Sequence, residues 1–180
     1  MGHLELIRDP ARAFPAVADP HAVRRATIWH CRYTSLAPLA EFRHLEQLVI
    51  ATFPDASLEF LGQLDKLRFL RIMHMPKVND IGPLAGLTQL TSLSLSTLPS
   101  WDASGKTTTI RSLEPLAAMP ALAHLELFGI CPPDKSLAPL EKCRHLRTAR
   151  FSHYPSAETD RFFKMTMVAN QFNPEPVVSV

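Results

Sequence analysis

One eleven-residue pattern recurs along the chain and limits what it can fold into. The copies lie at 35–45, 57–67, 80–90, 112–122 and 136–146, and the clearest reads DIGPLAGLTQL. Each copy leads into a second pattern, LxxLxL, and a degenerate earlier copy of LxxLxL begins at Val23. The first positions fall at 23, 45, 67, 90, 122 and 146, so the steps are 22, 22, 23, 32 and 24 residues. Self-similarity at about 20–29 residues predicts a stack of repeats with one shared core.

The spacing of the apolar residues predicts the structure of each half of the repeat. The fourth and sixth positions of LxxLxL alternate with period two, so both side chains point to the same side of a strand. The other half carries apolar residues at intervals of three, which predicts a short 3₁₀ or irregular helical turn, and its proline cannot extend a strand ladder. The predicted fold class is α/β: a leucine-rich-repeat solenoid, a short curved horseshoe with a parallel β-sheet on its concave face and these turns on its convex face.

The repeat resembles the bacterial 22-residue leucine-rich-repeat class, typified by internalin-like proteins, whose copies read much like xxIxDIxPLxxLxxLxxLxL. The resemblance covers roughly residues 23–155 and is best at NDIGPLAGLTQLTSLSL. It implies a solenoid that binds other macromolecules on its concave sheet. One position departs from the class, because the Asn usual three residues after LxL is missing. The residues there are Cys31, Phe53, Met75, Leu98, Ile130 and Tyr154, which predicts an apolar ladder in place of a polar one.

The repeats divide the chain into a solenoid and two caps, because the ends of a solenoid otherwise expose apolar surface. Residues 23–155 form the predicted solenoid of about six strands, with an insertion at 96–111 where the step is long. Residues 1–22 form an N-terminal cap with helix starts at Asp9-Pro10 and Asp19-Pro20. Residues 156–180 form a capping helix and a tail whose VVSV is a candidate edge strand. In that helix we expect Ser156 as N-cap and Phe162, Phe163 and Met167 on one side.

Composition excludes several classes of function. The net charge of +2 without a Lys/Arg run argues against a nucleic-acid partner. No apolar stretch approaches the ~20 residues that span a bilayer. The N-terminus MGHLELIRDP does not read as a signal peptide, and three widely spaced cysteines without CxxC predict reduced thiols. We therefore expect a cytoplasmic protein, and a secreted adhesin is disfavoured.

The third, fifth and seventh positions of each LxxLxL unit should point outward on the concave face. Aromatic residues, Met and Arg gather there, the types enriched at interface centres. The insertion, which leaves from Ser96, can overhang a floor of serines. Trp101 in the insertion either pins it to the body or contacts a partner, and the insertion or a terminus covering this face is an open alternative. The predicted partner-binding residues are Trp29, Phe69, Arg71, Met73, Ser94, Ser96, Trp101, His124, Glu126, Phe128 and Arg150.

Metal and catalytic sites have little support in the sequence. His30 and His74 share a repeat position but lie two strands apart, roughly 10 Å at ~4.8 Å per strand, whereas zinc–ligand bonds are ~2.0–2.1 Å. His124 and Glu126 beside the serines superficially resemble a Ser/His/acid arrangement, but a flat row of strand serines offers no nucleophile elbow. No GxxxxGK or GxGxxG is present. We expect no metal, no cofactor and no enzyme activity, and a hydrolase using this patch is the alternative.

The sequence thus predicts a non-enzymatic protein–protein interaction module that is monomeric on its own. An inhibitor or immunity-type protein ranks first among specific roles, and a cytosolic adaptor or scaffold second. Fold alone does not decide between them.

Overall fold

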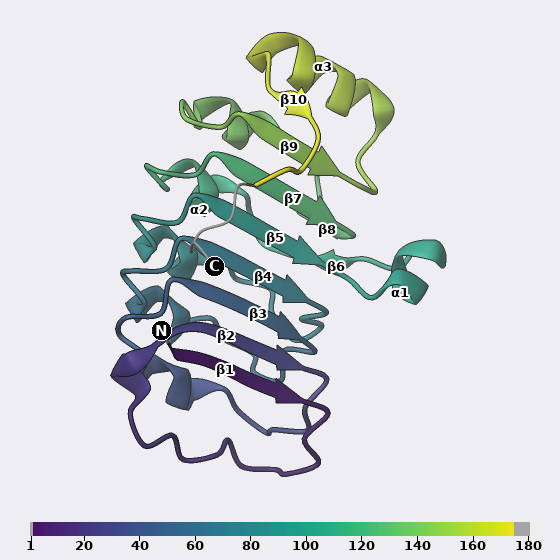
Figure 1. Cartoon of the computed structure of the whole chain (residues 1–180). Coiled ribbons are helices and arrows are strands. Elements are labelled where there is room, and N and C mark those ends of the chain that lie inside the picture. Colours follow the sequence, from purple (N-terminus) through teal and green to yellow (C-terminus); the bar gives the residue numbers. More distant parts are fainter. Residues whose placement is uncertain (1, 175–180) are drawn as a thin grey trace.

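The main sheet stacks eight parallel strands in the order β1-β2-β3-β4-β5-β7-β9-β10 (Figure 1). The computed structural model describes residues 2–174. The strands of this sheet are β1 (Gly2–Ile7), β2 (Val23–Trp29), β3 (Gln47–Ala51), β4 (Phe69–Met73), β5 (Ser92–Ser96), β7 (His124–Phe128), β9 (Thr148–Phe151) and β10 (Ala169–Asn170).

The six strands expected from LxxLxL are β2, β3, β4, β5, β7 and β9, and their apolar positions stack in register. Leu48 pairs with Leu70, Leu70 with Leu93 and Leu93 with Leu125. These leucines are fully buried. Each full burial of such a side chain stabilises the fold by about 1.5–3 kcal/mol, so the ladder of leucines is the main source of stability.

The second half of each repeat forms a short helical turn behind the sheet (Figure 1), as predicted. These turns are η2 (Ala37–Glu41), η3 (Leu61–Gln63), η4 (Gly82–Gly86), α2 (Glu114–Ala117) and η5 (Ala138–Lys142). In every copy a side-chain oxygen just ahead of the turn accepts a hydrogen bond from the amide two residues on, which starts the turn. The acceptors are Ser35, Ser57, Asp80, Ser112 and Ser136, at 3.1, 3.2, 2.8, 3.0 and 3.2 Å.

The chain leaves most strands through a residue in the left-handed region. Positive φ angles occur at Arg8, His30, Thr52, His74, Gly129 and His153. Thr97 holds the corresponding place after β5 without a positive φ, and there the chain departs into the insertion. One residue further along, the expected apolar ladder is buried at Phe53, Met75 and Ile130 and packs against the core at Cys31 and Tyr154. Leu98 breaks the ladder because the insertion carries it outward to an intermediate exposure.

The N-terminal end differs in part from the prediction. A 3₁₀ helix, η1 (Pro20–Ala22), does begin after Asp19, which accepts hydrogen bonds from the His21 and Ala22 amides. The helix expected after Asp9 was wrong, because the Asp9 carboxylate instead accepts from the Ala11 amide at 2.9 Å and the Tyr33 hydroxyl at 2.6 Å. The unexpected strand β1 arises because HLELI alternates, which turns its leucines toward the core.

A helix, α3 (Ser156–Thr166), lies at the C-terminal end of the stack. Its N-cap is Pro155 and no side chain caps it, so the expected role of Ser156 as N-cap was wrong. Phe162 is fully buried, but Met167 is 85% exposed because the helix ends there in a left-handed residue that turns the side chain away. After α3, β10 adds to β9. The VVSV segment lies outside the described residues.

The insertion folds into a helix and a strand. Helix α1 (Pro99–Ala103) projects beyond the ends of the main strands (Figure 1). It is followed by β6 (Thr108–Thr109), which pairs in parallel with β8 (Ile130–Cys131) as a separate two-stranded sheet. Among residues 2–174, no helix combines the length and apolar character required to cross a membrane.

Candidate functional site on the sheet face

The strand register arranges the outward side chains of β4, β5, β7 and β9 in three rows. We call this surface, which points away from the leucine core, the outer sheet face. All predicted partner-binding residues except Trp29 and Trp101 lie in the rows. Phe69, Ser92, His124 and Thr148 form the first row; Arg71, Ser94, Glu126 and Arg150 the second; Met73, Ser96 and Phe128 the third.

Glu126 organises the second row. Its carboxylate accepts a hydrogen bond from the Ser94 hydroxyl at 2.7 Å. Arg71 and Arg150 flank the same carboxylate at 3.8 and 3.9 Å. These distances are longer than the ~2.7–2.9 Å of a charge-assisted hydrogen bond, so both guanidinium groups keep donors available. The Glu126 side chain is only 13% exposed, whereas those of Arg71 and Arg150 are 41% and 54% exposed.

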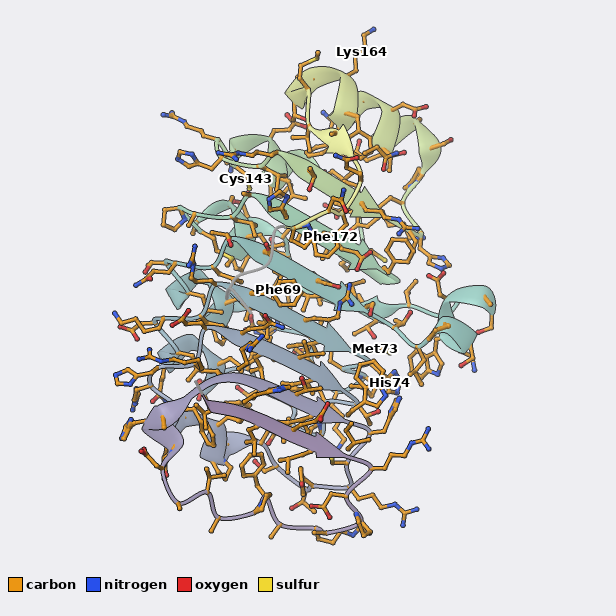
Figure 2. All side chains as sticks on the ribbon, viewed as in Figure 1. Phe69, Met73, His74, Cys143, Lys164 and Phe172 are labelled. Atoms are coloured by element: carbon orange, nitrogen blue, oxygen red, sulfur yellow. The ribbon has the colours of Figure 1, made fainter. Side chains whose placement is uncertain are left out.

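The third row is mostly apolar. The Arg150 guanidinium lies 4.6 Å from the centre of the Phe128 ring, within the range of a cation–π contact. Figure 2 shows Met73 at the end of β4 beside His74, while Phe69 lies at the start of the same strand. Trp29 falls on the same line as Met73 but is separated from it by Ala51 of β3. Trp29 therefore extends the third row but lies two strands away from Met73.

A hollow of about 430 Å³ lies between the third row and the insertion. We call it the apolar hollow, because Met73, Phe128 and Pro99 line it together with Arg71 and Glu126. Helix α1 contributes Pro99, Asp102 and Ala103 to its wall. The insertion thus borders the sheet face at the place where the sequence predicts an overhang.

Trp101 lies outside this hollow. Its ring packs edge-on against His74, with ring centres 4.8 Å apart, and the Lys106 ammonium lies 5.9 Å from its centre. Burial lowers the pKa of His74 because it disfavours the charged imidazolium, and the nearby His30 lowers it further through repulsion between two positive charges. The geometry fits the interpretation that Trp101 pins the insertion to the body, while a partner contact of Trp101 stays a prediction.

Asp102 is a second anchor of the insertion, and sequence reasoning missed it. Its carboxylate accepts a hydrogen bond from the Ser152 hydroxyl at 2.9 Å and lies 2.9 Å from Nε2 of His153. The Ser152 oxygen in turn accepts from the Gly129 amide at 2.8 Å. These partners are about fifty positions away in the chain, so no local pattern pointed to them. The insertion is therefore held at two places: by Trp101 against the residue after β4, and by Asp102 against the two residues after β9.

Within residues 2–174, the hydrogen bonds of Ser94 and His124 run to different partners and do not form a Ser/His/acid relay. Ser94 donates to Glu126, whereas Nδ1 of His124 lies 2.8 Å from the Thr148 hydroxyl. A relay requires the base to bond the nucleophile and the acid to orient the base. Within residues 2–174, no group of three or more His, Cys, Asp or Glu side chains is placed to hold a metal ion.

The fold is similar to that of two solved internalins from Listeria monocytogenes. Internalin C2 shares 23% identity over 73% of this chain and 53% of that structure, with a TM-score of 0.57. A second internalin (inlF) shares 21% identity over 83% of this chain and 47% of that structure, with a TM-score of 0.54. The chain thus spans about half the length of these internalins. No protein-family model and no curated protein matches the sequence. The structural likeness confirms the predicted internalin-like leucine-rich-repeat solenoid.

Proposed function

We propose that this chain is a protein-binding module whose partner docks on the outer sheet face between β4 and β9. The observation that carries the proposal is the apolar hollow. There Met73 and Phe128 lie beside the partly exposed Arg71, under a wall that α1 contributes. Aromatic residues, Met and Arg are enriched at the centres of interfaces, where they supply most of the binding energy.

The shape of the surface favours a macromolecular partner. The three rows cross four strands, a width of about 14 Å at ~4.8 Å per strand. Small molecules instead bind in pockets that enclose most of their surface. A loop or helix of a partner can cover the rows and insert one apolar side chain into the hollow. The two anchors of the insertion, at His74 and at Ser152 and His153, hold that wall in place before binding and so reduce the entropy cost.

We further propose that the module acts as an inhibitor or immunity-type protein in a reducing compartment such as the cytoplasm. In that role, covering a partner's surface is the whole action and no chemistry of its own is needed. The cysteines Cys31, Cys131 and Cys143 are free thiols, which fits such a compartment. A cytosolic adaptor or scaffold is the alternative, and it would require a second binding surface that acts independently of the outer sheet face.

The test is affinity capture from the native host, followed by reconstitution of the captured protein with purified chain. We expect Arg71→Glu and Phe69→Ala to abolish binding while the thermal midpoint shifts by no more than a few degrees. Arg12→Glu, an exposed arginine of the N-terminal loop, is the matched control and should bind normally. Equal binding by all variants would refute the proposed surface. Substrate turnover that His124→Ala abolishes would favour the hydrolase instead.

A further inference from the structure

A second hollow, of about 390 Å³, lies where the chain enters the strands. We call it the arginine hollow, because Arg68 and Arg147 line it together with His124, His145 and Ser92. Arg68 directly precedes β4 and Arg147 directly precedes β9. The same repeat position holds the small residues Thr91 before β5 and Ala123 before β7. Two long cationic side chains therefore flank a gap that the two repeats between them leave open.

The backbone on both sides of this gap is fixed. The Arg68 carbonyl accepts hydrogen bonds from the Thr91 and Ser92 amides at 2.9 and 3.1 Å. The Ala123 carbonyl accepts from the Arg147 amide at 2.8 Å. Ser92, only 2% exposed, is a lining residue of the hollow. The positions from which the guanidinium groups extend are thus set by the sheet itself.

The arginine hollow is lined by cationic and neutral side chains in the described part of the chain. Among residues 2–174, no acidic side chain lines it. Within residues 2–174, neither the Arg68 nor the Arg147 guanidinium has a hydrogen bond or a salt bridge. Glu46 holds the corresponding position before β3, but it pairs with Arg24 at 3.5 Å. Glu126, on the same face, is engaged by Ser94, Arg71 and Arg150.

We propose that the arginine hollow binds an acidic side chain, Asp or Glu, of the protein partner. The planar guanidinium group presents parallel N–H donors that match the two oxygens of a carboxylate. A nucleic acid is the less suitable ligand, because the chain's net charge is only +2 and Glu126 lies on the same face. Asn173 also lines the hollow, and Figure 2 shows Phe172 of the same C-terminal segment over the sheet, so this segment borders the hollow.

This inference rests on the proposed function, because Ser92 and His124 of the first row also line the arginine hollow. It specifies the partner: a segment with an apolar group for the apolar hollow and an acidic group for the arginine hollow.

The test uses the full chain and a fluorescent hexaglutamate peptide, with hexaglutamine and an oligothymidine as comparison probes. Anisotropy is measured at about 50 mM salt, where exposed charges are weakly screened. We expect hexaglutamate to bind and hexaglutamine not to bind. Arg68→Ala with Arg147→Ala should weaken hexaglutamate binding about tenfold or more. Arg12→Ala with Arg32→Ala removes equal charge from the N-terminal loop and the turn after β2, and should change binding less than about twofold.

Three results would overturn the inference: no binding of hexaglutamate, equal loss in both double variants, or tighter binding of oligothymidine through the same arginines. Circular dichroism confirms that each variant is folded. Partner capture separates the two proposals. If Arg71→Glu abolishes capture but the Arg68 and Arg147 variant binds hexaglutamate normally, only this inference fails. If Arg71→Glu and Phe69→Ala leave capture intact while the double variant loses hexaglutamate, the proposed function fails and the anion-binding hollow remains.

Discussion

Phe162→Ala should show how strongly α3 seals the C-terminal end of the solenoid. The Phe162 side chain is fully buried, and its ring meets those of Phe151 and Phe163 edge-on, with centres 5.5 and 5.4 Å apart. Truncating a buried Phe costs about 3–5 kcal/mol, and each aromatic pair adds ~0.5–1.5 kcal/mol beyond area burial. We therefore expect a loss of about 4 kcal/mol in the free energy of unfolding, measured by urea denaturation.

The location of the loss matters as much as its size. Because a repeat contacts only its neighbours, amides of α3 and β10 should exchange with solvent much faster, while those of β4 should change least. Met165→Ala, on the same helix but 64% exposed, is the matched control and should cost less than about 0.5 kcal/mol. A loss below about 1 kcal/mol for Phe162→Ala, or a loss equal to that of Met165→Ala, would refute the idea that α3 seals the core.

Three further predictions concern charge, backbone and the insertion. A hydrogen bond from Arg161 lowers the pKa of Glu158 to about 2, so this stabilisation is present above the ordinary value near 4.5 and is lost as the pH falls toward 2. Glu158→Gln should therefore cost about 1 kcal/mol in urea denaturation at neutral pH, and a deficit that persists unchanged near pH 2 would contradict the pairing. Gly129→Ala should cost about 1–3 kcal/mol, because φ is +65° and the new Cβ would lie 2.5 Å from the Thr97 hydroxyl; an unchanged urea midpoint would show that the strain is absent. Trp101→Ala should speed proteolysis within the insertion. It should also raise the pKa of His74, measured by NMR titration, because loss of the indole exposes the His74 ring to water. If neither the proteolysis rate nor the pKa changed, Trp101 would not be holding the insertion against the sheet.

The repeat pattern predicted most of the fold because each LxxLxL unit coincides with one strand of the main sheet. The leucines that stack from Leu48 to Leu125 were all readable from spacing. Strand β1 was not, because HLELI carries the alternation without the leading leucine or the preceding turn that mark a repeat. Strand β10 is two residues long, and so short a strand leaves no periodic signal.

The candidate site was predictable in part. Register alone placed Arg71, Glu126 and Arg150 in one row. The anchoring of Asp102 to Ser152 and His153 was not predictable, because it depends on how far the insertion reaches across neighbouring turns. Arg68 and Arg147 did have a readable signal, since both hold the position directly before a strand. Both lie outside the outward positions of the strands, so the LxxLxL pattern does not single them out.

The departure of the chain at Thr97 has a consequence for engineering. The other five repeat strands, β2, β3, β4, β7 and β9, are each followed within two residues by a left-handed residue that directs the chain into the next turn, but β5 is not. The Thr97 amide still donates to the Phe128 carbonyl at 2.9 Å, so the pairing of β5 with β7 continues up to the residue where the insertion begins. Residues 98–107 thus form a natural grafting point, where a foreign loop can be exchanged for the native one to reprogram recognition while the stacked leucines stay untouched.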